Sequence, residues 1–190
     1  MINFVFAYGS LQIPAVMHAV TRRYLASRPA RLDGYARYRL KRRSYPGLRR
    51  RSGAATEGML YCGVDGLALT RLDRFEDNFY RRQTLRVVIA PDRVVPAQVY
   101  VIPPRYYRLL QPGRWSLRQF QSTALKAYLR RCRRRVAIAD RQAGASRHNL
   151  PDRVSDGRST WVAEERGGLT RTGAKPGKQV PPGREDKLMS

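Results

Sequence analysis

The apolar residues of this chain occur in short runs that end at turn-forming residues, and this spacing most constrains the fold. A strand-like run at 3–7 stops at Tyr8-Gly9-Ser10-Leu11, where the glycine permits an abrupt turn. Short segments follow at 32–40, 58–62, 84–90 and 97–102, in which apolar and polar residues alternate or β-branched residues are frequent. Several short strands with few helices predict an α+β fold rather than a doubly wound parallel sheet.

Three segments have the pattern of helices. The first begins at Pro14, because proline suits the first helical turn. The second covers about Gly66 to Asp77, with Asp65 in the N-cap position. The third begins at Ser116, and Gln119 three residues later completes a predicted capping box.

The end of the chain has a different composition from the rest. The third helix is predicted to end in the arginine-rich run 130–135, and after about Ile138 periodicity gives way to Gly, Pro, Ser, Arg and Asp. Such a composition buries too little apolar surface to offset the entropy of ordering. The prediction is a folded domain over 1–137 and a low-complexity, disordered tail over 138–190. Within the domain, the basic stretch 49–55 is predicted to be an exposed loop.

Glu76 is the first candidate for chemistry. At about 100° per residue it falls within about 20° of Leu69, in the apolar face of the second predicted helix. A carboxylate there must be paired, protonated or facing a cavity, and burial raises its pKa toward the value that a general acid and base needs near neutral pH. The alternative is a structural ion pair with Arg81 or Arg82.

The loop after the first strand is the second candidate. Closely spaced backbone N–H groups around Gly9 would form a cradle for a carboxylate or an oxyanion, although an ordinary turn has the same composition. Tyr45 and Tyr100 are candidate pocket hydroxyls, with core packing as the alternative. The two histidines, His18 and His148, lie too far apart in the sequence to suggest a catalytic triad or a metal site.

Taken together, these pieces resemble the gamma-glutamylcyclotransferase-like (AIG2-like) family. The order and intervals match over about residues 1–120. The segments that carry the resemblance are Phe4-Val-Phe-Ala-Tyr8-Gly9-Ser10-Leu11, Tyr45-Pro46, Glu57-Gly58-Met-Leu-Tyr61, Leu72-Asp73-Arg-Phe75-Glu76, Tyr80-Arg81-Arg82 and Ala97-Gln-Val-Tyr100-Val101. The family has a small, mostly antiparallel, barrel-like sheet flanked by helices, and this fold is therefore expected.

The resemblance also implies a reaction. The Tyr8-Gly9-Ser10-Leu11 loop would bind a γ-glutamyl group and Glu76 would be the catalytic acid and base, so that a γ-glutamyl amine or peptide is cyclised to 5-oxoproline with release of the amine. No metal or organic cofactor is expected, because the ring closure is intramolecular. Asp77 departs from the pattern, since a glycine is common after the catalytic glutamate. A second carboxylate there is expected either to raise the pKa of Glu76 further or to indicate an altered use of the site.

The charge of the chain supports an alternative function. Lys and Arg number 38 against 14 Asp and Glu, a net charge of +24, and residues 1–137 hold 28 of the basic and 7 of the acidic side chains. This excess would suit a non-catalytic basic module that binds nucleic acid or another polyanion. A bias toward arginine is also expected from a GC-rich genome, and no nucleic-acid-binding motif accompanies the charge.

Two further features bear on the compartment. No apolar run approaches the ~18 residues needed to cross a bilayer, and the first residues lack the basic and apolar regions of a signal peptide. Cys62 and Cys132 form neither a C-x-x-C pair nor a disulfide framework. A cytoplasmic protein with no membrane partner is expected.

Overall fold

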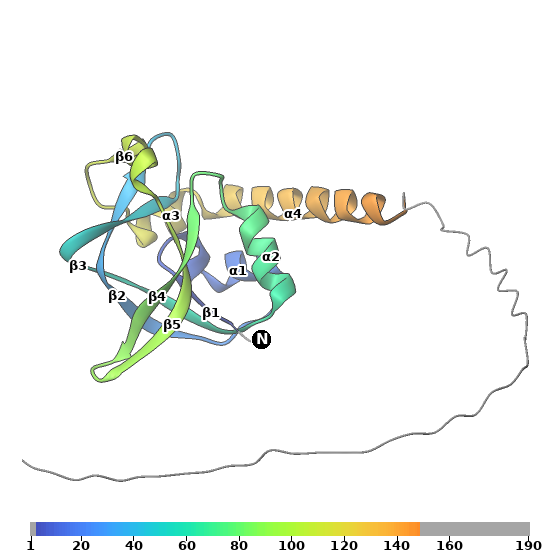
Figure 1. Ribbon diagram of the computed structural model, residues 1–190. Helices are drawn as coiled ribbons and strands as arrows, with labels where there is room; N and C mark the ends of the chain where they lie inside the picture. Colours follow the sequence, from blue (N-terminus) through green and yellow to red (C-terminus); the bar gives the residue numbers. More distant parts are fainter. Residues whose placement is uncertain (1–2, 149–190) are drawn as a thin grey trace, which may run out of the picture. The chain divides into compact units, whose positions relative to one another are not determined.

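A computed structural model describes the backbone of residues 3–148 and the side chains of residues 3–141. Five strands close into a small barrel that is flanked by helices, which confirms the predicted α+β class and the barrel-like sheet (Figure 1). The strands are β1 (Asn3–Ala7), β2 (Ser27–Leu40), β3 (Pro46–Val64), β4 (Arg81–Ala90), β5 (Arg93–Val101) and the short β6 (Leu110–Gln111). The sheet order is β3-β1-β5-β4-β2-β6, and a pairing of β2 with β3 closes it. Only the β1–β5 pairing among these is parallel.

The barrel interior follows from the period of two in its strands. Alternate residues point to opposite faces of a strand, and one buried cluster takes Phe6 from β1, Leu32 from β2, Val87 from β4 and Val99 from β5. The helices contribute no buried residue to this cluster. The other face of β1, with Val5 and Ala7, packs in a second cluster with the helices. Both faces of β1 are therefore buried, as its continuous apolar run suggests.

The helices are α1 (Pro14–Thr21), α2 (Gly66–Phe75), α3 (Leu117–Thr123) and α4 (Leu125–His148), with 3-10 turns η1 (Ser10–Gln12) and η2 (Pro104–Leu109). Figure 1 shows α1, α2 and α4 gathered beside the barrel, and contacts of α1 with both other helices agree with this arrangement. In the described part of the chain no helix is long and apolar enough to cross a membrane.

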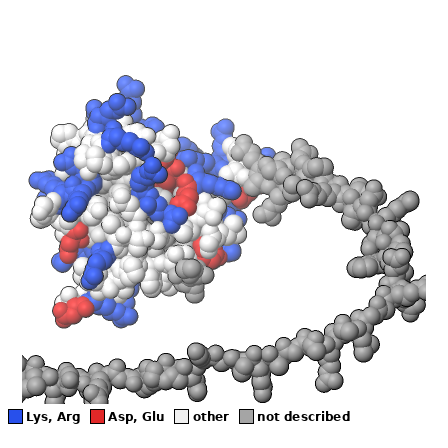
Figure 2. Space-filling model, in the orientation of Figure 1, with Lys and Arg blue, Asp and Glu red and all other residues white. Residues whose placement is uncertain are grey.

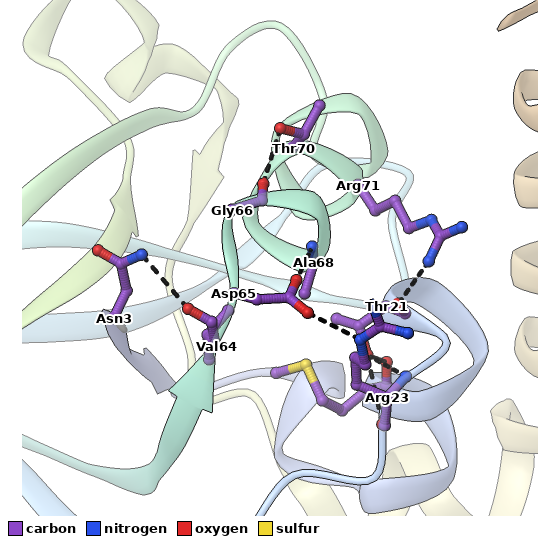
Figure 3. Close-up of polar contacts among 10 residues, drawn as sticks. Asn3, Thr21, Arg23, Val64, Asp65, Gly66, Ala68, Thr70 and Arg71 are labelled. Carbon is purple, nitrogen blue, oxygen red and sulfur yellow. Dashed lines mark hydrogen bonds and ion pairs between the residues drawn. The ribbon is translucent and has the colours of Figure 1, made fainter. Parts of the chain in front are cut away.

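The start of α2 is fastened to the end of α1 (Figure 3). The Asp65 carboxylate accepts a hydrogen bond from the Ala68 amide at 2.7 Å and one from the Arg23 side chain at 2.8 Å. Arg71, one turn further along α2, donates to the carbonyl of Thr21 at 2.9 Å. The predicted N-cap at Asp65 is thus confirmed, and these bonds set the direction in which α2 runs.

Two predictions about local structure are wrong. The stretch 49–55 is not a loop, because it lies in β3, where Arg49, Arg50 and Ala55 pair with β2 on either side of an irregularity in the ladder. Its side chains are largely exposed while its backbone is in the sheet, and the ladder is interrupted only between Asp33 and Tyr35, where Gly34 and Gly53 have φ of +76° and +71°. Glycine adopts this conformation without the steric penalty that other residues incur.

The third predicted helix also differs from the structure. It divides into α3 and α4 at Ala124, whose φ is −120°. Ser116 caps α3 as predicted, accepting a hydrogen bond from the amide of Gln119 at 3.2 Å. The predicted domain boundary after residue 137 falls inside α4, which continues to His148. The rest of the predicted tail lies outside the described residues and stays a prediction.

Candidate active site

A cleft of about 520 Å³ lies between the C-terminal end of β1, the C-terminal end of α2 and one face of α4. All seven sequence-predicted site residues line it: Tyr8, Gly9, Ser10, Leu11, Tyr45, Glu76 and Tyr100. The structure therefore brings together residues that are separated by more than ninety positions in the chain.

The loop that follows β1 forms one wall of the cleft. A Cβ on Gly9 would lie 2.9 Å from Cδ of Pro46, so a larger residue could not take its place without moving Pro46 at the start of β3. Immediately after Gly9 the chain enters the 3-10 turn η1 at Ser10. The first N–H groups of a helical turn have no acceptor within the turn, and the amides of Ser10 and Leu11 are in that position.

Side chains of this loop are held by buried hydrogen bonds. The Tyr8 hydroxyl donates to the carbonyl of Tyr100 at 2.7 Å, and the Ser10 hydroxyl donates to the hydroxyl oxygen of Tyr128 at 3.0 Å. Burial raises the pKa of the Tyr8 phenol well above its usual value. Tyr8 is therefore a neutral, fixed element of the site and not a proton donor at physiological pH.

Glu76 is the C-cap of α2, one residue beyond the end of the helix at Phe75, whereas the sequence predicted that the helix continues to about Asp77. Its amide still donates to the carbonyl of Leu72 at 3.0 Å, while its own ψ of 145° ends the helix. Among the residues described with side chains, none makes a hydrogen bond or an ion pair with the Glu76 carboxylate. The alternative pairing with Arg81 or Arg82 is wrong, because Arg82 binds Asp73 at 2.8 Å and Arg81 is exposed.

The electrostatic environment of Glu76 favours its protonated form. Burial is the main cause, and the negative charges of Asp77 and Asp73 add to it, whereas Arg135 acts in the opposite direction. Together they raise the pKa of Glu76 from 4.5 to about 8. The expected contribution of Asp77 is confirmed in direction. A carboxyl group with such a pKa can both accept and return a proton near neutral pH.

Asp77 has the opposite surroundings although it is the next residue. Its carboxylate accepts a hydrogen bond from the hydroxyl of Tyr45 and lies 3.7 Å from Nε of Arg43 and 3.6 Å from Nη1 of Arg135. Three side chains from two separate segments thus converge on one carboxylate. Through these contacts Asp77 links the turn after β2 to α4 at the entrance of the cleft.

The two predicted pocket tyrosines line the cleft, but neither has a free hydroxyl. Tyr45 donates to Asp77, and Tyr100 donates to Asp73 at 2.7 Å. Burial and these carboxylates raise the pKa of both phenols. Their apolar ring surfaces are therefore what they offer to a ligand, together with a shape fixed by the hydrogen bonds.

Two further tyrosines complete the floor and were not singled out from the sequence as site residues. Tyr80 donates to the carbonyl of Pro46 at 2.6 Å, and Tyr128 of α4 accepts from Ser10. Tyr80 belongs to a segment that carries the family resemblance, which was a usable signal. Tyr128 follows Phe120 and Ala124 at helical spacing, and no local pattern connects it with a loop more than a hundred residues away.

Nothing in the described part of the chain resembles a metal centre, since no three His, Cys, Asp or Glu side chains gather there. Cys132 lines the cleft, and burial raises the pKa of its thiol to about 11. It is therefore not a thiolate at neutral pH, and Glu76 remains the group best suited to proton transfer.

The closed five-stranded barrel with helices packed beside it makes this chain a small α+β protein. The family model described as gamma-glutamyl cyclotransferase, AIG2-like matches residues 5–117, more than half of the chain. The chain belongs to this family.

Relatives and solved structures agree with this membership. Protein AIG2 C of Arabidopsis thaliana is 33% identical over 122 residues, which covers 62% of this chain and 71% of that protein. Protein AIG2 A of the same plant is 27% identical over 158 residues, covering 80% and 89%. The solution structure of a protein from Arabidopsis thaliana has a TM-score of 0.53 and 27% identity, covering 83% of this chain and 96% of that one.

Proposed function

We propose that this protein is an enzyme that cyclises a γ-glutamyl amine or peptide to 5-oxoproline and releases the amine. One observation carries the proposal. A half-buried carboxyl group that makes no hydrogen bond or ion pair with the described side chains lines a cleft shared with the Tyr8–Leu11 loop. A carboxylate without partners is unfavourable in a fold unless it has a function that needs it.

In the proposed reaction Glu76 acts first as a base and then as an acid. The ionised Glu76 takes a proton from the α-ammonium of the substrate, and the freed nitrogen attacks the γ-carbonyl carbon to close a five-membered ring. The C–N bond to the leaving amine then breaks while Glu76 returns the proton to that nitrogen. The ring nitrogen gives up its second proton to the re-ionised Glu76, which passes it to the departing amine, so that the products are the neutral lactam and an ammonium. Proton, electron pair and leaving group balance within one substrate, so the enzyme supplies orientation, proton transfer and charge stabilisation.

The loop after β1 supplies the other two contributions. Backbone amides at Ser10 and Leu11 have no acceptor in their own turn and border the cleft, where they would bind the substrate carboxylate or the oxyanion formed during ring closure. The fixed hydroxyls of Tyr8 and Ser10 hold this loop in place. The substrate is thereby held so that its amine and γ-carbonyl meet within reach of Glu76.

The test is direct. Purified protein is incubated with a panel of γ-glutamyl amines and dipeptides, and 5-oxoproline is measured by chromatography, with Glu76→Gln as the control for a contaminating activity. We expect release from at least one compound by the wild type and little by the variant. No release from any compound would overturn the proposed activity.

A further inference from the structure

Arginine side chains form much of the outer edge, or rim, of the cleft. Five line it, two from the turn after β2 and three from α4: Arg42, Arg43, Arg131, Arg134 and Arg135. All five are exposed, whereas the floor residues Tyr8, Ser10, Tyr80 and Tyr128 are buried. A part of a bound molecule that projects from the floor toward solvent can therefore contact guanidinium groups.

The positive charge at this rim is only partly compensated. Arg43 and Arg135 lie beside Asp77, at 3.7 and 3.6 Å. The other three rim arginines (Arg42, Arg131 and Arg134) have no ion-pair partner among residues 3–141. Figure 2 shows Lys and Arg spread over the visible face with Asp and Glu in small groups. Charges of one sign that line a cleft attract ligands of the other sign.

The arginines of α4 are placed there by the helical repeat. Tyr128, Arg131 and Arg135 are three and four residues apart, which puts them on one face of the helix. The Arg131 guanidinium lies 5.2 Å from the centre of the Tyr128 ring, and the Tyr128 hydroxyl accepts from Ser10 of the loop. This chain of contacts holds a positive charge next to the loop to which we assign the γ-glutamyl group.

The charges of the substrate decide which part of it the rim would bind. A γ-glutamyl group carries one carboxylate and one ammonium, which cancel, and an ordinary amino acid as leaving group adds a single carboxylate. Three unpaired arginines exceed that charge. Resting on the proposed function, we infer that the leaving amine carries two or more anionic groups, as in an acidic γ-glutamyl peptide or a γ-glutamyl phosphoamino acid.

Matched substrates test this inference on the 190-residue chain. γ-Glutamyl-glutamate and γ-glutamyl-glutamine differ in one charge, and γ-glutamyl-phosphoserine and γ-glutamyl-serine differ in a phosphate. We expect kcat/KM to be about 10-fold higher for the acidic member of a pair, because two exposed ion pairs contribute about 2- to 5-fold each. The preference should shrink as salt is raised. Comparing the two pairs distinguishes carboxylate from phosphate as the favoured anion.

A double variant shows whether the rim is the cause. Arg131→Gln with Arg134→Gln should reduce the preference for the acidic member to about 2-fold, since the remaining rim charge is largely tied to Asp77. Arg133→Gln is the matched control, because Arg133 is exposed on the same helix and does not line the cleft, and it should keep the wild-type preference. An equal loss for both members of each pair would show that the rim binds the glutamyl carboxylate and would overturn the inference.

Binding measurements separate this inference from the proposed reaction. Calorimetry on Glu76→Gln reports affinity for the same four compounds without turnover. If the wild type releases no 5-oxoproline, yet the acidic compounds bind more tightly and the arginine variants abolish that difference, the proposed reaction fails and the inference stands. If 5-oxoproline is released with no charge preference in rate or in binding, the inference fails and the reaction stands.

Discussion

The two ends of α2 each hold a carboxylate, and their surroundings are opposite. At the start of the helix, Asp65 accepts a hydrogen bond from the Ala68 amide and pairs with Arg23, so its pKa is lowered (Figure 3). At its end, Glu76 has neither kind of partner among the described side chains, and burial raises its pKa to about 8.

This comparison separates a structural carboxylate from a chemical one. Asp65 compensates N–H groups at the positive end of the helix dipole, where a negative charge is favoured. Glu76 follows the last turn, where the dipole is negative and a carboxylate is disfavoured. Burial and the helix dipole both disfavour ionisation of Glu76, which gives it the raised pKa that proton transfer near neutral pH needs.

The largest expected effect is that of Glu76→Gln on turnover. The change keeps the size of the side chain and removes the proton carrier, so turnover should fall by about 10²- to 10⁴-fold while the protein remains folded. Substrate affinity should change less, because the loop at Tyr8–Leu11 is expected to hold the glutamyl group. Rates of 5-oxoproline release and thermal melting on the same preparation check this. A variant that is folded and fully active would show that another group transfers the proton.

The same variant should also change how stability depends on pH. Because the folded-state pKa of Glu76 is raised from 4.5 to about 8, the folded protein holds a proton that the unfolded chain releases between those values. Wild-type stability should therefore decline across this range relative to Glu76→Gln. Melting temperatures at pH 5 and pH 8 measure the difference, and a gap between the two proteins that does not widen with pH would contradict the raised pKa.

A smaller effect is expected from Asp77→Asn on the pH profile of activity. Glu76 must be ionised to accept a proton, so kcat/KM should rise with pH through about 8 in the wild type. Removing the negative charge of Asp77 lowers the pKa of Glu76 and should move this rise to lower pH. Burial, the larger cause, remains, so the pKa should stay above 4.5. Asp33→Asn is the control, because Asp33 pairs with Arg31 on β2 outside the cleft, and its profile should match the wild type.

Local patterns predicted much of this molecule because the interactions concerned are local. The run at 3–7 became β1, Pro14 begins α1, and Asp65 caps α2. Helical geometry also placed Glu76 among the apolar residues. Although α2 ends at Phe75, the amide of Glu76 still donates a hydrogen bond to the carbonyl of Leu72, so the backbone of Glu76 continues the last helical turn.

Long-range partners could not be predicted in the same way. The arginine-rich run 130–135 was interpreted as the end of a helix, yet α4 continues through it. The arginines of this run have different surroundings, because Arg135 lies beside Asp77 at the cleft whereas Arg133 is exposed and does not line the cleft. The contact depends on how α4 packs against the end of α2, about sixty residues earlier in the chain. The stretch 49–55 was wrongly predicted to be a loop for a related reason. Its exposed side chains give no sign that its backbone lies in β3 beside β2.

The smallest expected effect is at the other end of α2. Asp65→Ala removes the acceptor for the Ala68 amide, so the melting temperature should fall by a few degrees, as for the loss of an N-cap in a domain of this size. Turnover at a temperature well below melting should stay within about 2-fold of the wild type, because Asp65 does not line the cleft. Asp65→Asn is the matched control, since asparagine caps a helix nearly as well while lacking the charge that pairs with Arg23. Because the pKa of Asp65 is lowered in the fold, the advantage of wild type over Asp65→Asn should be present at neutral pH and disappear as the pH falls through that pKa. A loss of activity in Asp65→Ala as large as that in Glu76→Gln, without unfolding, would remove the distinction between the two carboxylates.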